Sequence, residues 1–235
     1  MKKIIIASTS TLHGGGYLDY LLPSLKNHFS NCKSLLFIPY ARPGGISHKG
    51  YTQKVADVFK ALDIDVKGIH EFENPAYAVK NAEALFTGGG NTFLLVSQLY
   101  KMNVMDAIHN AVKAGTPYLG TSAGSNICGL SMQTTNDMPI IYPPSFKTLG
   151  LVPFNINPHY LDPLEGTTHM GETRETRIKE FHQFNSQPVV GLREGSWLEV
   201  SGSQIYLKGN LQARLFRQGQ EPEEIETGSD ISWLK

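Results

Sequence analysis

Short apolar segments alternate with helix-like segments over the first half of the chain, and this alternation constrains the fold more than any other feature. The expected strands are residues 3–8, 34–40, 66–70, 84–87 and 117–119. Between them, apolar side chains recur at helical spacing in residues 17–29, 51–62, 73–82, 94–100 and 104–114. Strands separated by helices pair in parallel and are covered on both faces. We therefore predict an α/β fold with a mostly parallel, doubly wound sheet.

The second half of the chain continues this pattern and then changes. Helices are expected at residues 125–130 and within 171–185, the second with Ile178, Phe181 and Phe184 as its buried face. Further strands are expected at residues 154–157 and 189–192. Three short strands with turns follow at residues 197–201, 204–208 and 213–217, which predicts antiparallel strands at the sheet edge. The acidic residues 221–230 are predicted to be solvated.

Length and charge limit the classes of protein that this chain can belong to. A chain of 235 residues is within the range of one domain, and we expect a single catalytic domain over residues 1–235. Its 21 basic and 21 acidic residues balance, which argues against nucleic acid or an anionic membrane as a partner. No apolar run reaches the roughly 20 residues of a membrane span, and the N-terminal run is too short for a signal peptide. We expect a cytoplasmic protein.

A glycine-rich turn follows the strand at residues 117–119. Gly120, Ser122 and Gly124 form the G-x-S-x-G pattern of a nucleophile elbow, where a tight strand-to-helix turn exposes a serine hydroxyl. The N–H group of the next residue then points to where an oxyanion forms. Ser122 is the candidate nucleophile, and the N–H of Ala123 is a candidate oxyanion donor.

Three consecutive glycines, residues 88–90, lie between another strand and its helix. They do not match either common phosphate-binding motif. A simple tight turn is one interpretation; the other is that an N–H of Gly89 or Gly90 is the second oxyanion donor. Both glycines and Ser122 follow strands, and in parallel sheets the carboxyl ends of strands form the binding edge.

His159 and Glu194 also fall at predicted strand ends, so one edge can bring them to Ser122. A glutamate can replace aspartate as the group that orients the histidine, because its task is to fix the tautomer and stabilise the imidazolium. The chain order serine, histidine, acid differs from the order serine, acid, histidine of α/β-hydrolases.

Six separate motifs occur together in a fixed order: GGGNTF from Gly88, SAG from Ser122, TTNDMPI from Thr134, INPH from Ile156, GETRE from Gly171 and LREGSW from Leu192. In these motifs the chain closely resembles the alpha-aspartyl dipeptidases of the S51 family of serine peptidases. The resemblance implies a flavodoxin-like fold related to class I glutamine amidotransferases. It also implies hydrolysis of dipeptides that begin with aspartate.

The resemblance assigns roles to individual residues. It makes Ser122 the nucleophile, His159 the base, Glu194 its partner, and the glycines at 88–90 with Ala123 the oxyanion donors. Arg174 matches the aspartate-binding position, and a guanidinium suits a carboxylate because it forms two parallel hydrogen bonds. Asp137 would receive the substrate ammonium, and it is also the competing candidate for the acid.

Near His159 the sequence differs in two ways from the related families. Leu161 occupies the position where the amidotransferases carry their acid, which excludes their arrangement. The segment at residues 161–170 is slightly longer than is usual in the S51 family.

The sequence leaves two alternatives open: a cyanophycinase-like S51 peptidase acting on beta-aspartyl substrates, and a non-catalytic small-molecule binding module of the same fold. No metal or organic cofactor is expected, since there is no H-E-x-x-H motif and the two cysteines, Cys32 and Cys128, are far apart. A small peptide is the expected partner as substrate, and a homodimer is left open.

Overall fold

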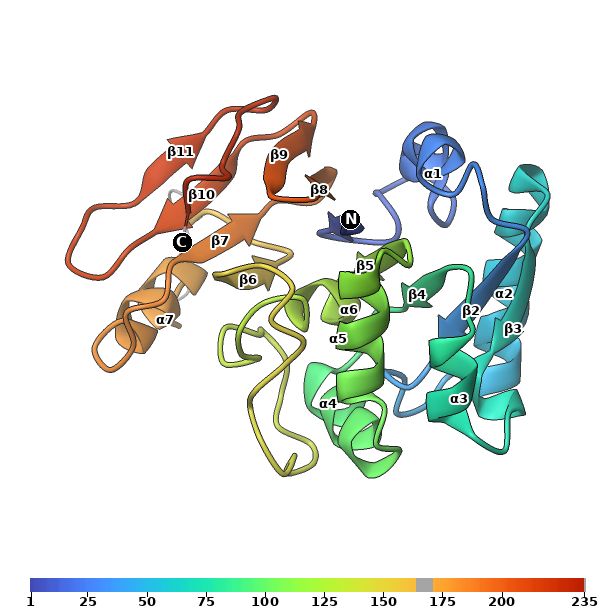
Figure 1. Ribbon diagram of the computed structural model, residues 1–235. Helices are drawn as coiled ribbons and strands as arrows, with labels where there is room; N and C mark the ends of the chain where they lie inside the picture. Colours follow the sequence, from blue (N-terminus) through green and yellow to red (C-terminus); the bar gives the residue numbers. More distant parts are fainter. Residues whose placement is uncertain (164–170, 235) are drawn as a thin grey trace.

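The computed structural model describes residues 1–163 and 171–234, which form two β-sheets with helices packed against them (Figure 1). The larger sheet has seven strands in the order β3-β2-β4-β5-β1-β8-β9. The strands β1 to β5 pair in parallel, whereas β8 and β9 are antiparallel and complete one edge. Their bounds are β1 Lys3–Ala7, β2 Ser34–Ile38, β3 Asp65–Gly68, β4 Leu85–Thr87, β5 Tyr118–Thr121, β8 Ser196–Ser201 and β9 Gln204–Gly209.

Helices cover both faces of this sheet, because its strands carry apolar side chains on both sides. Ile5 belongs to the same apolar cluster as Leu25 of α1, whereas Ile6 belongs to the cluster of Leu95 of α4. The helices are α1 Leu22–His28, α2 His48–Phe59, α3 Pro75–Lys80, α4 Thr92–Lys101 and α5 Met105–Ala114, with 3-10 turns at Asp19–Leu21, Lys60–Leu62 and Ile69–Glu71. None of the helices within the described ranges combines the length and apolarity that crossing a bilayer requires. The predicted doubly wound sheet with antiparallel edge strands is confirmed.

The smaller sheet has four strands in the order β11-β10-β7-β6 and lies at the left of Figure 1, with α7 beside it. Only its pair β6 and β7 is parallel. The bounds are β6 Asn155–Pro158, β7 Val189–Leu192, β10 Ala213–Phe216, β11 Glu223–Ile225 and α7 Arg174–Phe181. Val190 and Leu215 of this sheet share one apolar cluster with Ile4 and Ile6 of the larger sheet, so a single core joins the two.

Four local predictions are wrong. The helix expected at residues 125–130 is instead the short α6, Ala123–Asn126, because the next carbonyl, that of Ile127, accepts the N–H of Leu149 from a distant segment. Phe184 is 92% exposed, since α7 ends before it and helical spacing no longer applies.

The third error concerns the acidic tail, part of which is structured. Within the tail, β11 pairs with β10, and Ile225, opposite Ala213, is buried. The fourth error concerns β10, which was expected at the edge of the larger sheet and instead pairs with β7 in the smaller one.

Candidate active site

Ser122 lies at the turn between β5 and α6, and its backbone is in an unusual conformation. Its φ of 54° and ψ of −112° place it in a region that residues with side chains rarely adopt. The flanking glycines make this turn feasible. A Cβ added at Gly120 would lie 2.3 Å from the carbonyl oxygen of Gly124, and one added at Gly124 would lie 2.1 Å from that of Thr87. The G-x-S-x-G pattern therefore reflects close backbone packing around the serine.

His159 lies between Ser122 and Glu194 and contacts both. Its Nε2 is 2.9 Å from the Oγ of Ser122, and its Nδ1 is 2.6 Å from the Oε1 of Glu194. The histidine follows β6 and the glutamate follows β7, so both come from the smaller sheet, whereas the serine comes from the larger one. The structure thus brings the three predicted residues together at the junction of two sheets rather than along one edge.

A residue that sequence reasoning missed, Ser8, joins the strand ends at this junction. It follows β1, is fully buried, and accepts the backbone N–H of His159 at 2.9 Å. Its hydroxyl donates to the carbonyl of Leu192 at 2.7 Å, two residues before Glu194. Its position at the carboxyl end of the first predicted strand, the same sheet edge as Ser122, was a signal that could have found it.

The glycine loop after β4 lies directly against the elbow. A Cβ added at Gly89 would lie 2.8 Å from the Cβ of Ser122, so only a glycine permits this approach. The hydroxyl of Tyr51 donates to the carbonyl of Gly89 at 3.3 Å. Because the carbonyl and the following N–H of a trans peptide point in opposite directions, the N–H of Gly90 points away from Tyr51. Ala123, the other predicted donor, is buried at the start of α6.

A cavity of about 370 Å³ opens above Ser122. It is lined by Thr92, Ser122, Ala123, Thr135, Asn136, Asp137, Pro158, His159, Leu161, Arg174 and Glu194. Every predicted site residue except the loop glycines therefore lines one cavity. The slightly longer segment noted after His159 lies mostly outside the described residues.

Asp137 lies in this cavity but does not contact the histidine as the acid would. Its Oδ2 accepts the N–H of Thr92, at the start of α4, at 2.7 Å, and is 3.0 Å from the hydroxyl of Thr135. The nitrogen of His159 that an orienting acid would bind is occupied by Glu194. The geometry thus favours Glu194 over Asp137 as the partner of the histidine.

Arg174, the first residue of α7, is half-buried in the cavity wall. Its Nη1 is buried without a hydrogen-bond partner among the described residues. Burial lowers the pKa of Arg174 and nearby Arg177 adds to this, while Glu194 and Asp137 act in the opposite direction. A guanidinium remains charged under these conditions, and a buried unpaired donor is costly. The site therefore fits an anionic group of a ligand.

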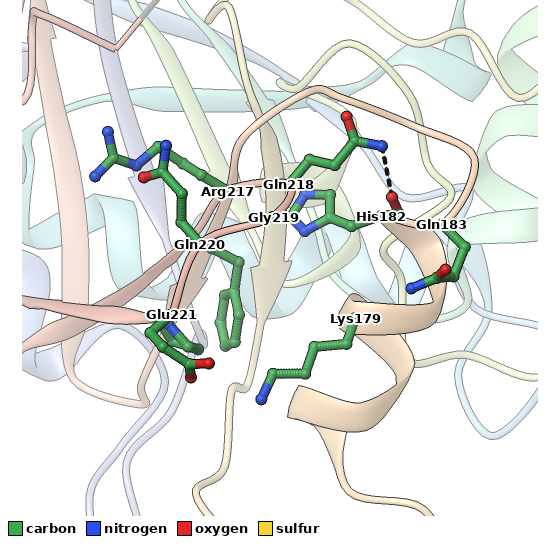
Figure 2. A pocket seen from close by; sticks show the side chains of 10 residues that line it. Lys179, His182, Gln183, Arg217, Gln218, Gly219, Gln220 and Glu221 are labelled. Atoms are coloured by element: carbon green, nitrogen blue, oxygen red, sulfur yellow. Dashed lines mark hydrogen bonds between the residues drawn. The ribbon is translucent and has the colours of Figure 1, made fainter.

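A second cavity, of about 450 Å³, opens at the C-terminal end of α7 (Figure 2). Lys179, His182 and the turn at residues 216–222 line it, and it contains none of the predicted site residues. Lys179 is paired with Glu175 at 2.9 Å, and the side chain of Gln218 donates to the carbonyl of His182. Two of its polar side chains, Lys179 and Gln218, thus already have partners within the protein. In the described part of the chain, no three side chains of the metal-binding types come together as a metal site would need.

Known proteins share the sequence and the fold. The profile of peptidase family S51 matches residues 4–208. The chain is 49% identical over 232 residues to Peptidase E of Streptomyces coelicolor, covering 99% of this chain and 94% of that protein. It is 44% identical over 236 residues to a Drosophila melanogaster protein named "Probable alpha-aspartyl dipeptidase", with coverage of 99% and 97%.

A solved structure of a peptidase from an acI-B1 actinobacterium has the same fold. Its TM-score is 0.73 at 17% identity, and the match covers 98% of this chain and 96% of that one. The family itself is established by the profile match and by the relatives above 40% identity, which cover nearly the whole chain. The chain belongs to peptidase family S51.

Proposed function

We propose that this protein is a serine-type dipeptidase that hydrolyses dipeptides with an N-terminal aspartate, with Ser122, His159 and Glu194 as its catalytic residues. The observation that carries the proposal is the His159 ring, which contacts the serine hydroxyl through one nitrogen and the carboxylate through the other. The names of the relatives, Peptidase E and alpha-aspartyl dipeptidase, support the substrate class.

In the proposed reaction, the Oγ of Ser122 attacks the carbonyl carbon of the peptide while the Nε2 of His159 takes its proton. The oxyanion accepts hydrogen bonds from the N–H of Ala123 and, because it points away from Tyr51, that of Gly90. The C–N bond then breaks, and the histidine returns the proton to the leaving amine. Water, deprotonated by His159, cleaves the acyl-enzyme and releases aspartate.

Arg174 and Asp137 are the proposed specificity residues. Arg174 would bind the side-chain carboxylate of the substrate aspartate, since its Nη1 lacks a hydrogen-bond partner within the described residues. Asp137 would receive the α-ammonium through its Oδ1, because its Oδ2 is occupied by Thr92 and Thr135. A cation and an anion on one cavity wall match the two charges that distinguish an N-terminal aspartate.

We further propose that residues 1–235 form a single catalytic domain acting in the cytoplasm, with a small peptide as its substrate. The apolar cluster shared by the two sheets supports the single domain, and the balanced charge supports the absence of a nucleic-acid or membrane partner.

Hydrolysis of a small substrate panel tests the proposal. The purified protein should cleave Asp-Leu, leave Ala-Leu nearly untouched, and cleave alpha-linked faster than beta-linked aspartyl dipeptides. A fluorophosphonate should label Ser122, and Ser122→Ala should fold normally yet lose roughly 10⁴- to 10⁶-fold in turnover. Preference for beta-linked aspartyl-arginine would identify a cyanophycinase-like enzyme, and an unlabelled serine with no turnover would indicate a binding module.

A further inference from the structure

The backbone of His159 is in a conformation that a residue with a side chain rarely adopts. Its φ is 53°, in the left-handed region, where the Cβ of an L-residue is crowded against the following carbonyl. A backbone of this kind persists only where its surroundings hold it. The direction of the imidazole ring toward Ser122 therefore depends on the contacts that fix the peptide groups on either side of this histidine.

The peptide group before His159 is held at both of its polar ends. Its N–H donates to the hydroxyl of Ser8 at 2.9 Å, and its carbonyl, that of Pro158, accepts the side-chain amide of Asn136 at 2.7 Å. The next N–H along the chain donates to the carbonyl of Leu192 at 2.9 Å, which fixes the peptide group after the histidine. Because peptide groups are planar, these contacts fix two planes, and the two planes together set the backbone angles of the histidine.

Asn136 is itself held in place by a second asparagine. Its Oδ1 accepts the Nδ2 of Asn157 at 2.9 Å, and the same Nδ2 donates to the carbonyl of Thr134 at 2.8 Å. A backbone carbonyl only accepts hydrogen bonds, so the carbonyls of Thr134 and Pro158 determine which end of each amide faces them. Asn157 is buried, and the two amides thus connect residues 134–136 firmly to the end of β6.

Asn136 lies at the reaction site itself. It lines the cavity above Ser122 together with His159 and with its chain neighbour Asp137. Asp137 is anchored separately, by the N–H of Thr92 at 2.7 Å. Two adjacent residues therefore carry the contact to the backbone of the proposed base and the proposed ammonium site.

We propose that Asn136 is a positioning residue for His159, because its amide holds the peptide group before the histidine so that Nε2 stays directed at Ser122. This inference rests on the proposed function. Ser8 and Asn136 hold the two ends of one peptide group, and loss of either contact lets its plane rotate. Since the left-handed backbone is unfavourable, a released histidine moves toward the ordinary regions and its ring turns away from the serine.

The test measures kcat and KM for Asp-Leu. Asn136→Ala should lower kcat by roughly 10- to 100-fold, because a small displacement of the base slows the reaction more than it weakens binding. KM should change much less, since Arg174 and Asp137 remain, and the rate of fluorophosphonate labelling of Ser122 should fall with kcat. Asn136→Asp keeps the size of the side chain but places an acceptor opposite the carbonyl of Pro158, so kcat should stay low.

Thr134→Val is the matched control. Thr134 is buried in the same segment, and its hydroxyl donates at 3.0 Å to the carbonyl of Ile156 in β6, which belongs to a different peptide group from the one before His159. Both Asn136→Ala and Thr134→Val should unfold at lower urea concentrations than the wild-type protein, because each loses a hydrogen bond to β6. Only Asn136→Ala should lower kcat and the labelling rate.

A double-mutant cycle with Ser8→Ala tests whether the two side chains share one task. If both hold the same peptide group, losing the second contact adds little once the first is gone. The variant with Ser8→Ala and Asn136→Ala should therefore lose about as much kcat as the worse of its two single variants.

Each outcome bears on the inference. Wild-type kcat in Asn136→Ala, recovery of kcat in Asn136→Asp, an equal loss in Thr134→Val, or losses that multiply in the double variant would overturn the role of Asn136 and leave the proposed function standing. The urea transition shows whether each variant is folded, and if Asn136→Ala is not, the same cycle with Asn136→Asp decides. A wild-type protein that neither cleaves Asp-Leu nor reacts with the fluorophosphonate would overturn the proposed function instead.

Discussion

A histidine activates a serine when one ring nitrogen donates its N–H to an acceptor and the other, unprotonated nitrogen can accept the proton of the serine hydroxyl. The carboxylate of Glu194 at the Nδ1 of His159 sets this order, because an acceptor there requires the proton on Nδ1 and leaves Nε2 facing Ser122. The charge of the glutamate then stabilises the imidazolium that forms during the reaction.

This arrangement predicts different effects for the two carboxylates of the cavity. Glu194→Gln retains size but removes the charge, so kcat for Asp-Leu should fall by roughly 10³- to 10⁴-fold. Asp137→Asn should act mainly on KM, because Asp137 contacts Thr92 and not the histidine. Steady-state kinetics of both variants checks this. A collapse of kcat in Asp137→Asn, with Glu194→Gln unaffected, would show that the acid is misassigned.

Arg174 should determine the preference for aspartate. Arg174→Met should reduce the discrimination between Asp-Leu and Ala-Leu by up to roughly 10⁴-fold, since a site built for a polar group rejects substrates that lack it. Arg177→Met, three residues along α7, is the control, because Arg177 does not line the cavity above Ser122 and is 3.7 Å from Glu172. Unchanged discrimination in Arg174→Met would leave the source of the preference outside this residue.

Local sequence patterns predicted the parallel strands and their helices, because burial on both faces leaves continuous apolar runs in β1, β2 and β4. They did not predict which strands share a sheet. The residues of β10 would suit the edge of the larger sheet as well as a place beside β7. Only the tertiary packing decides that the strand pairs with β7. The acidic β11 was missed for a similar reason, since only Ile225 marks it as buried.

The candidate site was predictable where chemistry requires a residue type at a strand end, as at Ser122, His159 and Glu194. The role of Ser8 depends on which strands are neighbours, so the residue carried no distinctive motif.

Arg193, next to Glu194, makes several ion pairs within and beside the smaller sheet. Arg193 donates to both oxygens of Asp162 and both oxygens of Glu224, and its side chain is only 15% exposed. Its hydrogen bonds lower the pKa of Asp162. For Glu224, burial raises the pKa, but Arg193 and Arg214 outweigh this and lower it overall. Arg193 thus ties β7 to the segment after His159 and to β11.

These pKa shifts predict how the contribution of Arg193 varies with pH. A carboxyl whose pKa is lower in the folded chain adds stability that is fully present above its ordinary pKa, about 4, and is lost as the pH falls through the lowered value. Arg193→Met should therefore cost about 1–2 kcal/mol at pH 7, a value reduced by the partial exposure of Asp162, and less at pH 3.

Urea unfolding of both proteins at the two pH values measures this difference. Lys33→Met, which removes an almost fully exposed pair with Asp63, is the control and should change little at either pH. An Arg193→Met variant with the same loss at pH 7 and pH 3 would contradict the assignment.

The proposed catalytic residues come from two sheets, and their alignment depends on how the sheets are joined. The serine is placed by β5, whereas the histidine and the glutamate are placed by β6 and β7. Ser8, at the end of β1, binds the backbone of His159 and that of Leu192, so one hydroxyl connects three strand ends from both sheets.

Ser8 is therefore predicted to position the histidine without touching the substrate. Removing its hydroxyl leaves the N–H of His159 unpaired and lets the ring shift relative to Ser122, and a displacement of this kind is worth up to roughly 10²-fold in rate. Ser8→Ala should lower kcat for Asp-Leu by about 10- to 100-fold with little change in KM, since Arg174 and Asp137 are unaffected. Ser8→Thr, which keeps the hydroxyl, should recover most of kcat.

Thr148→Val separates this effect from a general loss of stability. Thr148 is also buried, and its hydroxyl donates to the carbonyl of Gly129 at 2.7 Å, away from the cavity above Ser122. Ser8→Ala loses two hydrogen bonds of a buried hydroxyl and Thr148→Val loses one, so both variants should unfold at lower urea concentrations, but only Ser8→Ala should slow fluorophosphonate labelling of Ser122. If the two variants have the same kcat, the junction of the sheets does not depend on Ser8, and the larger contacts of the shared apolar core must hold the histidine in place.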